Sequence, residues 1–417
     1  MAGVSFFPGS ADPVFRRTAL LCWFGWVFDF FDLILIAFLI PTIEQSFHTG
    51  HEVGAWLVGV GLGASGLGGI VFGALADRYG RKPILTVTVL LFSIGMLLTG
   101  ASQTITQFLI ARFITGIGLG GEWAVGHALI AESVPANERA RWSAFLQSGE
   151  PVGVAIAAVV GFSIAPVVGW RTVIMASSLT GFLALAFRKW LQESPRWLNR
   201  KLNQGNEANQ NTDLQGLTPS VFLSKYGWVT FLAFILAVFK LGTYWTCYTW
   251  LPRFISESFG AKLNQSALWI LSGQVGQYVG MGVFGNVADR FGRRWAFSVF
   301  SVITALALGC LACFWSVLFN TMPVAFWTLI TIMGFGSGCT AGFGALLSEL
   351  FPTGIRTFAM GSVYNAARGV QLFSPVLVAQ AVQVDGLRGG LLVPTGLAVL
   401  TALWVWTLPD KKGQILE

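Results

Sequence analysis

The chain has 417 residues, of which 54% are hydrophobic and 11% charged, and its mean hydropathy is +0.67. An average soluble domain carries roughly 25% charged residues, so a soluble enzyme and a disordered chain are both excluded. The net charge of +7 lies in short basic clusters between apolar runs, which favours a membrane protein over a nucleic-acid-binding protein.

Apolar segments long enough to cross a bilayer as helices follow one another along the chain, since a hydrocarbon layer of roughly 30 Å needs about 20 apolar residues. In chain order they occupy residues 18–41, 53–76, 83–101, 105–133, 143–165, 170–191, 226–251, 265–288, 294–316, 323–349, 357–383 and 389–408. The sequence therefore predicts an all-α membrane protein with twelve transmembrane helices.

A long polar segment separates the sixth and seventh spans. Residues 192–225 include the string NQGNEANQNTDLQG, which has few apolar side chains and is typical of a flexible linker. We therefore expect an N-terminal six-helix bundle over residues 1–191, a cytoplasmic linker over 192–225 and a C-terminal six-helix bundle over 226–417.

The distribution of basic residues predicts the orientation, because loops rich in Lys and Arg resist transfer across the membrane. With the N-terminus in the cytoplasm, nineteen of the 26 Lys and Arg residues fall on that side, while Arg112, Lys240 and Arg368 lie at membrane depth. We expect a multi-pass protein of the plasma (inner) membrane with both termini in the cytoplasm.

Two charged motifs occur twice at nearly the same offset. GALADRYGRK at residues 73–82 recurs as GNVADRFGRR at 285–294, and ESVPANER at 132–139 recurs as ELFPTGIR at 349–356. Such an internal repeat indicates two related bundles around a central path, which is typical of a transporter.

These motifs resemble those of the major facilitator superfamily over essentially the whole chain. The Gly-x-x-x-Asp-Arg-x-Gly-Arg-Arg/Lys signature stands in both halves, and Arg112-x-x-x-Gly116-x-Gly118 looks like the second family motif. The strings FDFFD at 28–32 and GGEW at 120–123 are similar to those of proton symporters of organic acids, in the sialate, metabolite and aromatic-acid branches. The string QESPRW at 192–197 is instead similar to the sugar-porter signature.

The resemblance implies a cytoplasmic gate that clamps the two halves together. Its predicted members are Gly73, Asp77, Arg78, Arg81, Glu132, Arg139, Asp289, Arg290, Glu349 and Arg356. The alternative role of the basic residues is loop anchoring, but anchoring requires no particular Gly and Asp spacing.

Two acidic residues lie deep in the first span. At 1.5 Å per residue from Arg17, Asp29 and Asp32 stand roughly 18 and 22 Å up the helix, and a spacing of three places them on one face. Two carboxylates this close in a poorly solvated cavity cannot both stay ionised cheaply, so this pair is expected to exchange protons. The alternative is that a neighbouring donor holds one of them permanently.

Other charged residues extend the predicted proton-coupling set. Arg112 matches a family position tied to proton transfer, and Glu122 is a further deep acid, with a pair to Arg112 or to a neighbouring helix as its alternative role. Glu150 precedes Pro151 and is expected at a wet cytoplasmic bend, although it too is a candidate proton carrier.

The cations at membrane depth predict the binding site. A charged residue there costs at least about 2.5 kcal/mol on insertion scales, so each should face the bundle interior. Arg368 stands near the midplane of the eleventh span, and its planar guanidinium fits a carboxylate in two-point contact. We expect it to anchor a substrate carboxylate, with a structural pair to an acid as the alternative. Further substrate-binding candidates are Lys240, Tyr244, Tyr248, Gln274, Gln277, Tyr278, Tyr364 and Asn365.

The resulting hypothesis is a secondary active transporter that moves a small organic anion, a carboxylate, with protons by alternating access. A neutral sugar or polyol:proton symporter and a non-transporting nutrient sensor are the alternatives. An enzyme is not expected, because none of the three histidines stands in a catalytic or metal-site spacing. We expect no metal or other cofactor, no nucleic acid, and a monomer whose partners are the substrate, protons and lipid.

Overall fold

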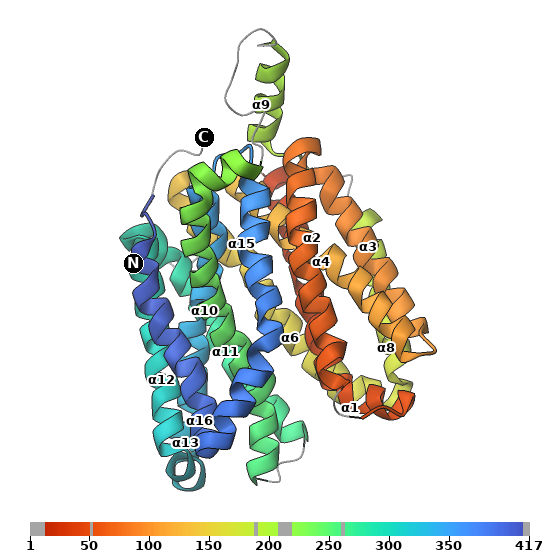
Figure 1. The fold of residues 1–417 in the computed structure, drawn as a ribbon, viewed down its shortest axis with the longest axis vertical. Coiled ribbons are helices and arrows are strands. Elements are labelled where there is room, and N and C mark those ends of the chain that lie inside the picture. Colours follow the sequence, from red (N-terminus) through yellow and green to blue (C-terminus); the bar gives the residue numbers. More distant parts are fainter. Residues whose placement is uncertain (1–12, 51–52, 187–190, 207–218, 260–262, 412–417) are drawn as a thin grey trace.

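The computed structural model describes residues 13–50, 53–186, 191–206, 219–259 and 263–411. Nearly all of them are helical, as a lipid-embedded chain requires, because a helix satisfies its backbone hydrogen bonds within itself. Most helices before residue 192 gather on one side and those after 218 on the other, with α9 (Pro195–Asn206) standing at one end (Figure 1). Helix α5 (Arg139–Gln147), however, lies against α11 (Leu263–Phe291) and α14 (Gly342–Leu350).

The N-terminal group begins with four long helices and continues with a broken one. Its helices are α1 (Pro13–Phe47), α2 (Gly54–Tyr79), α3 (Arg81–Ala101), α4 (Ile105–Ser133), α5 (Arg139–Gln147), α6 (Gly149–Val159), α7 (Ala165–Val168) and α8 (Trp170–Ala186). A 3₁₀ turn, η1 (Ala136–Glu138), precedes α5, and a π-helical turn, η2 (Val160–Ile164), joins α6 to α7. The predicted span 143–165 is therefore interrupted, which hydropathy does not report.

The C-terminal group also begins with long helices, but its breaks start one span earlier, after α13. It comprises α10 (Pro219–Phe259), α11 (Leu263–Phe291), α12 (Arg293–Thr321), α13 (Pro323–Ser337), η4 (Gly338–Ala341), α14 (Gly342–Leu350), α15 (Arg356–Val370), η5 (Gln371–Phe373), α16 (Ser374–Trp404) and η6 (Val405–Thr407). Backbone angles inside α16 leave the helical region at Asp385 and Gly386, so the eleventh span ends and the twelfth begins within this element.

Nine helices of the described ranges meet the length and hydropathy expected of a membrane span. The predicted spans 170–191, 265–288 and 357–383 are not among them. For α8 only 17 residues are described, α15 has 15 residues, and the glutamines of α11 lower its hydropathy. Each of the three nevertheless coincides with a helix at the predicted place.

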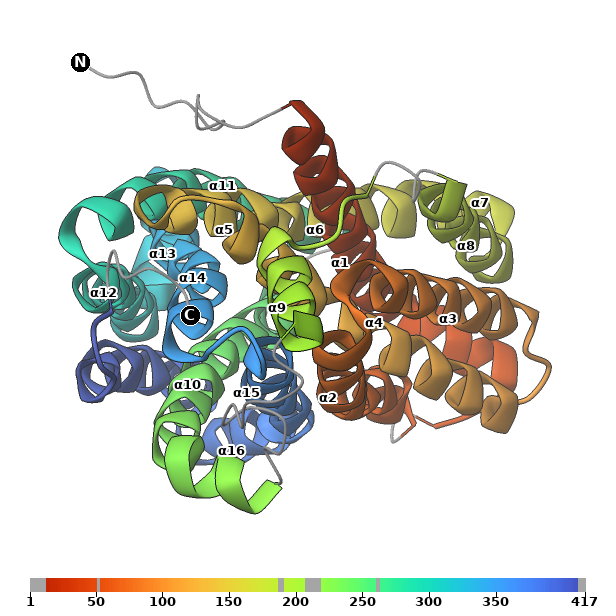
Figure 2. The same cartoon turned by 90° about the horizontal axis from the view of Figure 1, so that it is seen from above.

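The polar segment 192–225 differs from the expected linker. Helix α9 occupies part of it and α10 already begins at Pro219, while residues 207–218 lie outside the described residues. Helix α9 lies over the middle of the molecule, beside α2, α4 and α15 (Figure 2).

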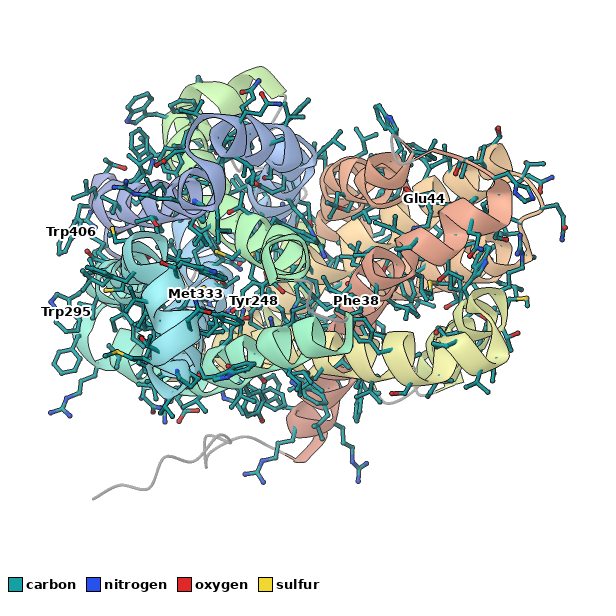
Figure 3. All side chains as sticks on the ribbon, turned by 90° about the horizontal axis from the view of Figure 1, so that it is seen from below. Phe38, Glu44, Tyr248, Trp295, Met333 and Trp406 are labelled. Carbon is teal, nitrogen blue, oxygen red and sulfur yellow. The ribbon has the colours of Figure 1, made fainter. Side chains whose placement is uncertain are left out.

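The repeated motif has a structural counterpart in the turns that join its helices. Gly80 between α2 and α3 and Gly292 between α11 and α12 both have φ 104° and ψ 158°, a conformation that residues with a Cβ rarely adopt. We call this end of the molecule the gate end. Seen from the opposite end, Tyr248 lies near the middle and Trp295 and Trp406 at the outer rim (Figure 3).

Helices α2 and α15 form a seam between the two groups at which their backbones touch. A Cβ on Gly73 would lie 2.7 Å from the carbonyl oxygen of Thr357, and one on Gly66 would lie 3.3 Å from that of Asn365. Gly361 of α15 meets the backbone of Gly69 in the same way. Glycines on both helices therefore allow this close contact, as small residues do in lipid.

Candidate functional site

At the gate end, Asp77 joins the N-terminal group to the first turn of α15. Its carboxylate accepts the backbone N–H groups of Thr357 at 3.2 Å and Phe358 at 2.9 Å, and lies 3.1 Å from Arg81. The first N–H groups of a helix have no partner within the helix and carry partial positive charge, so a carboxylate there is stabilising. Gly73, one turn before Asp77, allows α15 to come this close.

Glu132 completes this first arm of the gate end. It accepts Arg81 at 2.9 Å and Arg356, from the C-terminal group, at 2.7 Å, and all three side chains are buried. The first arm, defined as Asp77, Arg81, Glu132 and Arg356, is thus a charge network between the two groups.

A second arm repeats the arrangement with the groups exchanged. Asp289 accepts two backbone N–H groups at the start of α5, at 3.1 and 3.2 Å, and lies 3.0 Å from Arg293. Glu349 accepts Arg293 at 2.7 Å and Arg139, from the N-terminal group, at 2.9 Å. The structure therefore brings together most of the predicted gate residues.

Arg78 and Arg290, also predicted in the gate, lie elsewhere. Both are exposed, and each guanidinium lies over the ring of the following aromatic residue, at 5.3 and 5.2 Å. The guanidinium groups beside Asp77 and Asp289 come from Arg81 and Arg293, four residues further along.

The segment that leads into α9 adds contacts to the first arm. Glu193 accepts the backbone N–H groups of Arg81 at 2.9 Å and Lys82 at 3.1 Å, which caps α3. Ser194 donates a hydrogen bond to Glu132, and the indole N–H of Trp197 donates to the carbonyl of Asp77 at 3.0 Å. The QESPRW string is thus a structural support of the gate end, a role that its sequence alone did not indicate.

Deep in the N-terminal group, Asp32 is paired with Arg112. Nη1 of Arg112 donates to both carboxylate oxygens, at 2.7 and 3.0 Å, and both residues are fully buried. Of the two predicted carboxylates, Asp32 is therefore the one held by a donor.

Asp29 has a different environment. It is 0% exposed, and neither of its carboxylate oxygens has a hydrogen-bond donor among the described residues. The charged groups around it are Glu122 on α4, Arg368 on α15 and Asp32 on its own helix. Glu122 is therefore not part of the ion pair at Arg112, and of its two alternative roles only the contact with a neighbouring helix, α1, is present.

Arg368 lies at the boundary of the two groups. It is 1% exposed, and its guanidinium lies 5.5 Å from the ring of Trp26 and 5.3 Å from that of Phe30. Nη1 and Nη2 have no acceptor in the part of the chain that the structure describes. A buried guanidinium without acceptors is costly, so this site favours an anion.

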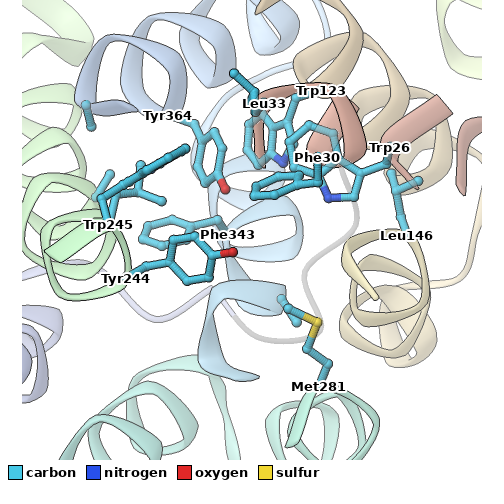
Figure 4. Close-up of a cluster of buried hydrophobic side chains, with 14 of the residues drawn as sticks. Trp26, Phe30, Leu33, Trp123, Leu146, Tyr244, Trp245, Met281, Phe343 and Tyr364 are labelled. Carbon is cyan, nitrogen blue, oxygen red and sulfur yellow. The ribbon is translucent and has the colours of Figure 1, made fainter. Parts of the chain in front are cut away.

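Aromatic and polar side chains from both halves of the molecule lie in the same central region as Arg368. Figure 4 shows the hydroxyl groups of Tyr244 and Tyr364 turned toward the side of the cluster that holds Phe30 and Trp26. The ring of Tyr364 stacks on Trp123 with a centroid distance of 3.7 Å. The aromatic walls and unpaired donors suit a flat, partly polar ligand.

Glu150 differs from its sequence-based prediction. It is 1% exposed, not at a wet bend, and accepts Gln147 at 2.7 Å and Gln277, from α11, at 2.9 Å. Lys240 lies near enough to interact with its charge. Gln147 ends α5 and Glu150 lies in the first turn of α6, so the short break at Ser148 brings the two side chains together.

Of the remaining predicted binding residues, some lie in the central region and others contact neighbouring helices. The hydroxyl of Tyr248 and both amide atoms of Gln274 are buried without a partner within the described ranges. Asn365 donates to the carbonyl of Gly120 at 2.8 Å and so links α15 to α4, while Tyr278 is only half-buried.

Comparison with known proteins gives consistent matches over the whole chain. The family model described as Major Facilitator Superfamily matches residues 22–275 and 241–416. The sialic acid transporter NanX of Escherichia coli (strain K12) is 30% identical, with 96% of each chain covered. A Cupriavidus pinatubonensis protein named as a 4-methylmuconolactone transporter is also 30% identical, over 98% of this chain and 94% of the relative. Other relatives are named for transport of a metabolite, cis,cis-muconate and benzoate.

Among solved structures, the proton:xylose symporter XylE, bound to 6-bromo-6-deoxy-D-glucose, matches with a TM-score of 0.79. The match covers 97% of both chains at 20% sequence identity. At this identity the likeness shows the fold and carries no information about the substrate.

Proposed function

Because the chain belongs to the major facilitator superfamily, and is therefore a membrane-embedded secondary transporter and not an enzyme, we propose that it moves a small organic anion, a carboxylate, together with protons. The twelve-helix fold predicted from the sequence is confirmed by the family match and by the likeness to XylE. The class of substrate is inferred from the side chains at the boundary of the two halves.

The observation that carries the proposal is Arg368. Its two terminal nitrogens are buried at the boundary of the halves with no acceptor among the residues described. A carboxylate would accept both in a two-point contact, and the rings of Trp26 and Phe30 would flank its apolar part. Tyr244, Tyr248, Gln274 and Gln277 supply further polar contacts from the C-terminal half.

Proton coupling follows from the position of Asp29. When ionised, Asp29 balances the charge of Arg368 and competes with the substrate for it. A proton on Asp29 removes this competition, so the anion and the proton bind together. The charges of Glu122 and Asp32 act on Asp29. Asp32 is itself paired with Arg112, and this ion pair links α1 to α4.

The two arms at the gate end are assigned as the cytoplasmic gate, with both termini on that side. Residues 1–191 and 226–417 form the two rocking bundles, and 192–225 join them. Opening this gate requires the contacts of Asp77 and Asp289 with α15 and α5 to break, together with the inter-group ion pairs of Glu132 and Glu349.

Uptake into proteoliposomes tests the proposal. Vesicles with an imposed pH gradient are supplied with radiolabelled benzoate, cis,cis-muconate, N-acetylneuraminate or D-xylose, with and without nigericin to collapse the gradient. We expect accumulation of at least one carboxylate and its loss with nigericin. Arg368→Ala should abolish accumulation, whereas Arg388→Ala, whose side chain is 60% exposed, should not. Gradient-independent uptake would refute proton coupling, and normal uptake by Arg368→Ala would refute the anchor.

The second candidate is a neutral sugar:proton symporter. It is favoured by Gln274, whose amide oxygen and nitrogen are both buried and unpartnered among the described residues, since amides pair well with hydroxyl groups. Accumulation of D-xylose without any carboxylate in the same assay would support this alternative.

A further inference from the structure

A crevice within the N-terminal half reaches Glu122 without crossing the boundary between the halves. It provides about 60 Å³ of space, more than one water molecule needs. Its walls come from α1, α3, α4, α8 and Leu191, all in the N-terminal half. The wall residues used below are Cys22, Gly25, Val89 and Glu122.

The crevice lies near the gate end, yet it is separate from the gate. Leu85 and Thr86 in its wall stand one turn into α3, which begins at Arg81 of the first arm. Both arms are closed in this structure, as their ion pairs show. The crevice therefore reaches Glu122 without passing through either closed arm.

On its inner side, Glu122 borders the central residues. A smaller void of about 10 Å³ lies between Glu122, Trp26, Trp123 and His127. Trp26 is one of the two rings beside Arg368. Glu122 is 6% exposed whereas Asp29 is 0% exposed, so of these two acids Glu122 is the one in contact with the crevice.

Glu122 is one of the charged groups around Asp29, across the contact between α4 and α1. A proton can pass between two carboxyl groups only when one of them carries it, because an ionised carboxylate has no donor. Glu122 also adjoins Gly25 of α1, where any larger side chain would displace its carboxylate. The glycine thus lets the Glu122 carboxyl group reach α1, the helix of Asp29.

We propose that protons leave Asp29 through Glu122 and this crevice, on a route separate from that of the substrate. The proposal rests on the proton coupling proposed above. The carboxylic acid of Asp29 gives its proton to the Glu122 carboxylate, and the Glu122 acid then gives it to water in the crevice. Asp29, now ionised, pairs electrostatically with Arg368.

The charges around Glu122 keep this route coupled to the substrate. The titratable groups that face it are Asp29 and Cys22 on α1 and His127 on α4, while α3 contributes apolar and hydroxyl side chains to the crevice and α8 contributes a glycine. An anion on Arg368 removes the counter-charge of Asp29, so Asp29 keeps its proton while the substrate is bound. The proton departs only after the substrate has left.

Cys22 provides a test that needs no substrate, because it lines both the crevice and the inner void. In a variant that retains only this cysteine, with Cys247, Cys310, Cys313 and Cys339 replaced by alanine, we expect the small water-borne reagent 2-aminoethyl methanethiosulfonate to modify Cys22 in the native protein. Val89→Phe, which fills the crevice, should slow modification about tenfold. Val87→Phe, on the outward face of the same helix at 43% exposure, is the matched control.

Transport measurements separate proton release from substrate binding. Counterflow exchanges labelled for unlabelled substrate and needs no proton release, whereas net uptake does. With radiolabelled benzoate as the probe, Val89→Phe should lower net uptake about fivefold or more and leave counterflow within about twofold, since only the return of the unloaded carrier is slowed. Val87→Phe should leave both unchanged.

The possible results distinguish this inference from the proposed function. If Cys22 reacts only after denaturation, or only with an apolar maleimide that enters from lipid, the crevice is not a water path and the inference is wrong. Equal losses of counterflow and net uptake in Val89→Phe would also overturn it. Absence of proton-coupled uptake in the unmodified protein would instead refute the proposed function, while water access to Cys22 would still be measurable.

Discussion

Replacing Glu132 by glutamine removes the charge that holds the first arm together. Its carboxylate accepts Arg81 at 2.9 Å and Arg356 at 2.7 Å, and all three side chains are 0% exposed. Glutamine has nearly the same shape, so the substitution removes charge without leaving a void. We expect the closed gate to be destabilised relative to the open one, in which water reaches the two guanidinium groups.

The expected size of this effect follows from burial. Removing one partner of a buried ion pair costs about 3–5 kcal/mol, because the other charge stays buried without compensation. Even the lower figure shifts a two-state equilibrium on the order of a hundredfold. If roughly 1% of molecules are open before the change, about half would be open after it.

Distances between spin labels at the gate end measure this shift. Tyr79 and Phe291 occupy equivalent places in the two halves, are 53% and 55% exposed, and are suitable for replacement by labelled cysteines after the native cysteines are removed. Asp385→Asn is the control, because its pair with Arg388 is exposed at 51% and 60% and should contribute less than about 1 kcal/mol. An unchanged distance distribution in Glu132→Gln, with Asp385→Asn also unchanged, would refute the assigned role of the first arm.

Three further changes test the packing and charge arguments through melting temperatures in detergent. Gly73→Ala places a methyl group 2.7 Å from the α15 backbone and should cost about 1–3 kcal/mol, whereas Gly63→Ala, with nothing within 4 Å of the added group, should cost nothing; equal melting temperatures would contradict the seam. Glu193→Gln weakens the cap of α3 and should cost about 1 kcal/mol; an unchanged melting temperature would argue against the cap. Arg112→Gln leaves Asp32 buried and unpaired at a cost of about 3–5 kcal/mol, and the double variant with Asp32→Asn should recover part of it; no recovery would mean that the charge of Asp32 is not the cause.

The membrane spans were predictable because lipid imposes a single simple requirement. Any segment that crosses must be apolar for about 20 residues, and this length can be counted in the sequence. Interruptions inside a span, as at Val160–Ile164 and Gly338–Ala341, leave the hydropathy unchanged and so were not foreseen. Helices also continue past the apolar stretch into water, which is why α10 begins at Pro219 and not at residue 226.

The membership of the gate was largely predictable from the repeat, but the contacts were not. Asp77 lies at the end of α2 and Arg81 begins α3, so the turn at Gly80 brings Arg81 back to Asp77, whereas Arg78, one residue from Asp77, points about 100° away on α2. Helical periodicity argued against Arg78 from the sequence, but the return of Arg81 to Asp77 depends on the conformation of the turn at Gly80. The capping role of Glu193 was not available, because it depends on where the chain returns after the sixth span.

In the central site, the buried charged residues were predictable from the sequence, but which acid contacts which partner was not. That Asp32 and not Asp29 holds Arg112 is decided by the distance between α1 and α4. The place of Glu150 was missed because its partner Gln277 stands on another helix, 127 residues further along. Contacts between the halves depend on packing, which no local pattern records.

The glycine seam between α2 and α15 determines how the two halves can move. Interlocked large side chains would have to disengage before one helix could shift past the other, which would add a barrier at every step. Where backbone meets backbone, as Gly361 meets Gly69, no side chain has to disengage and gradual shear is possible. The resistance to motion is then concentrated in the charged arms, so turnover can be tuned by a few ionic contacts without rebuilding the surfaces that slide.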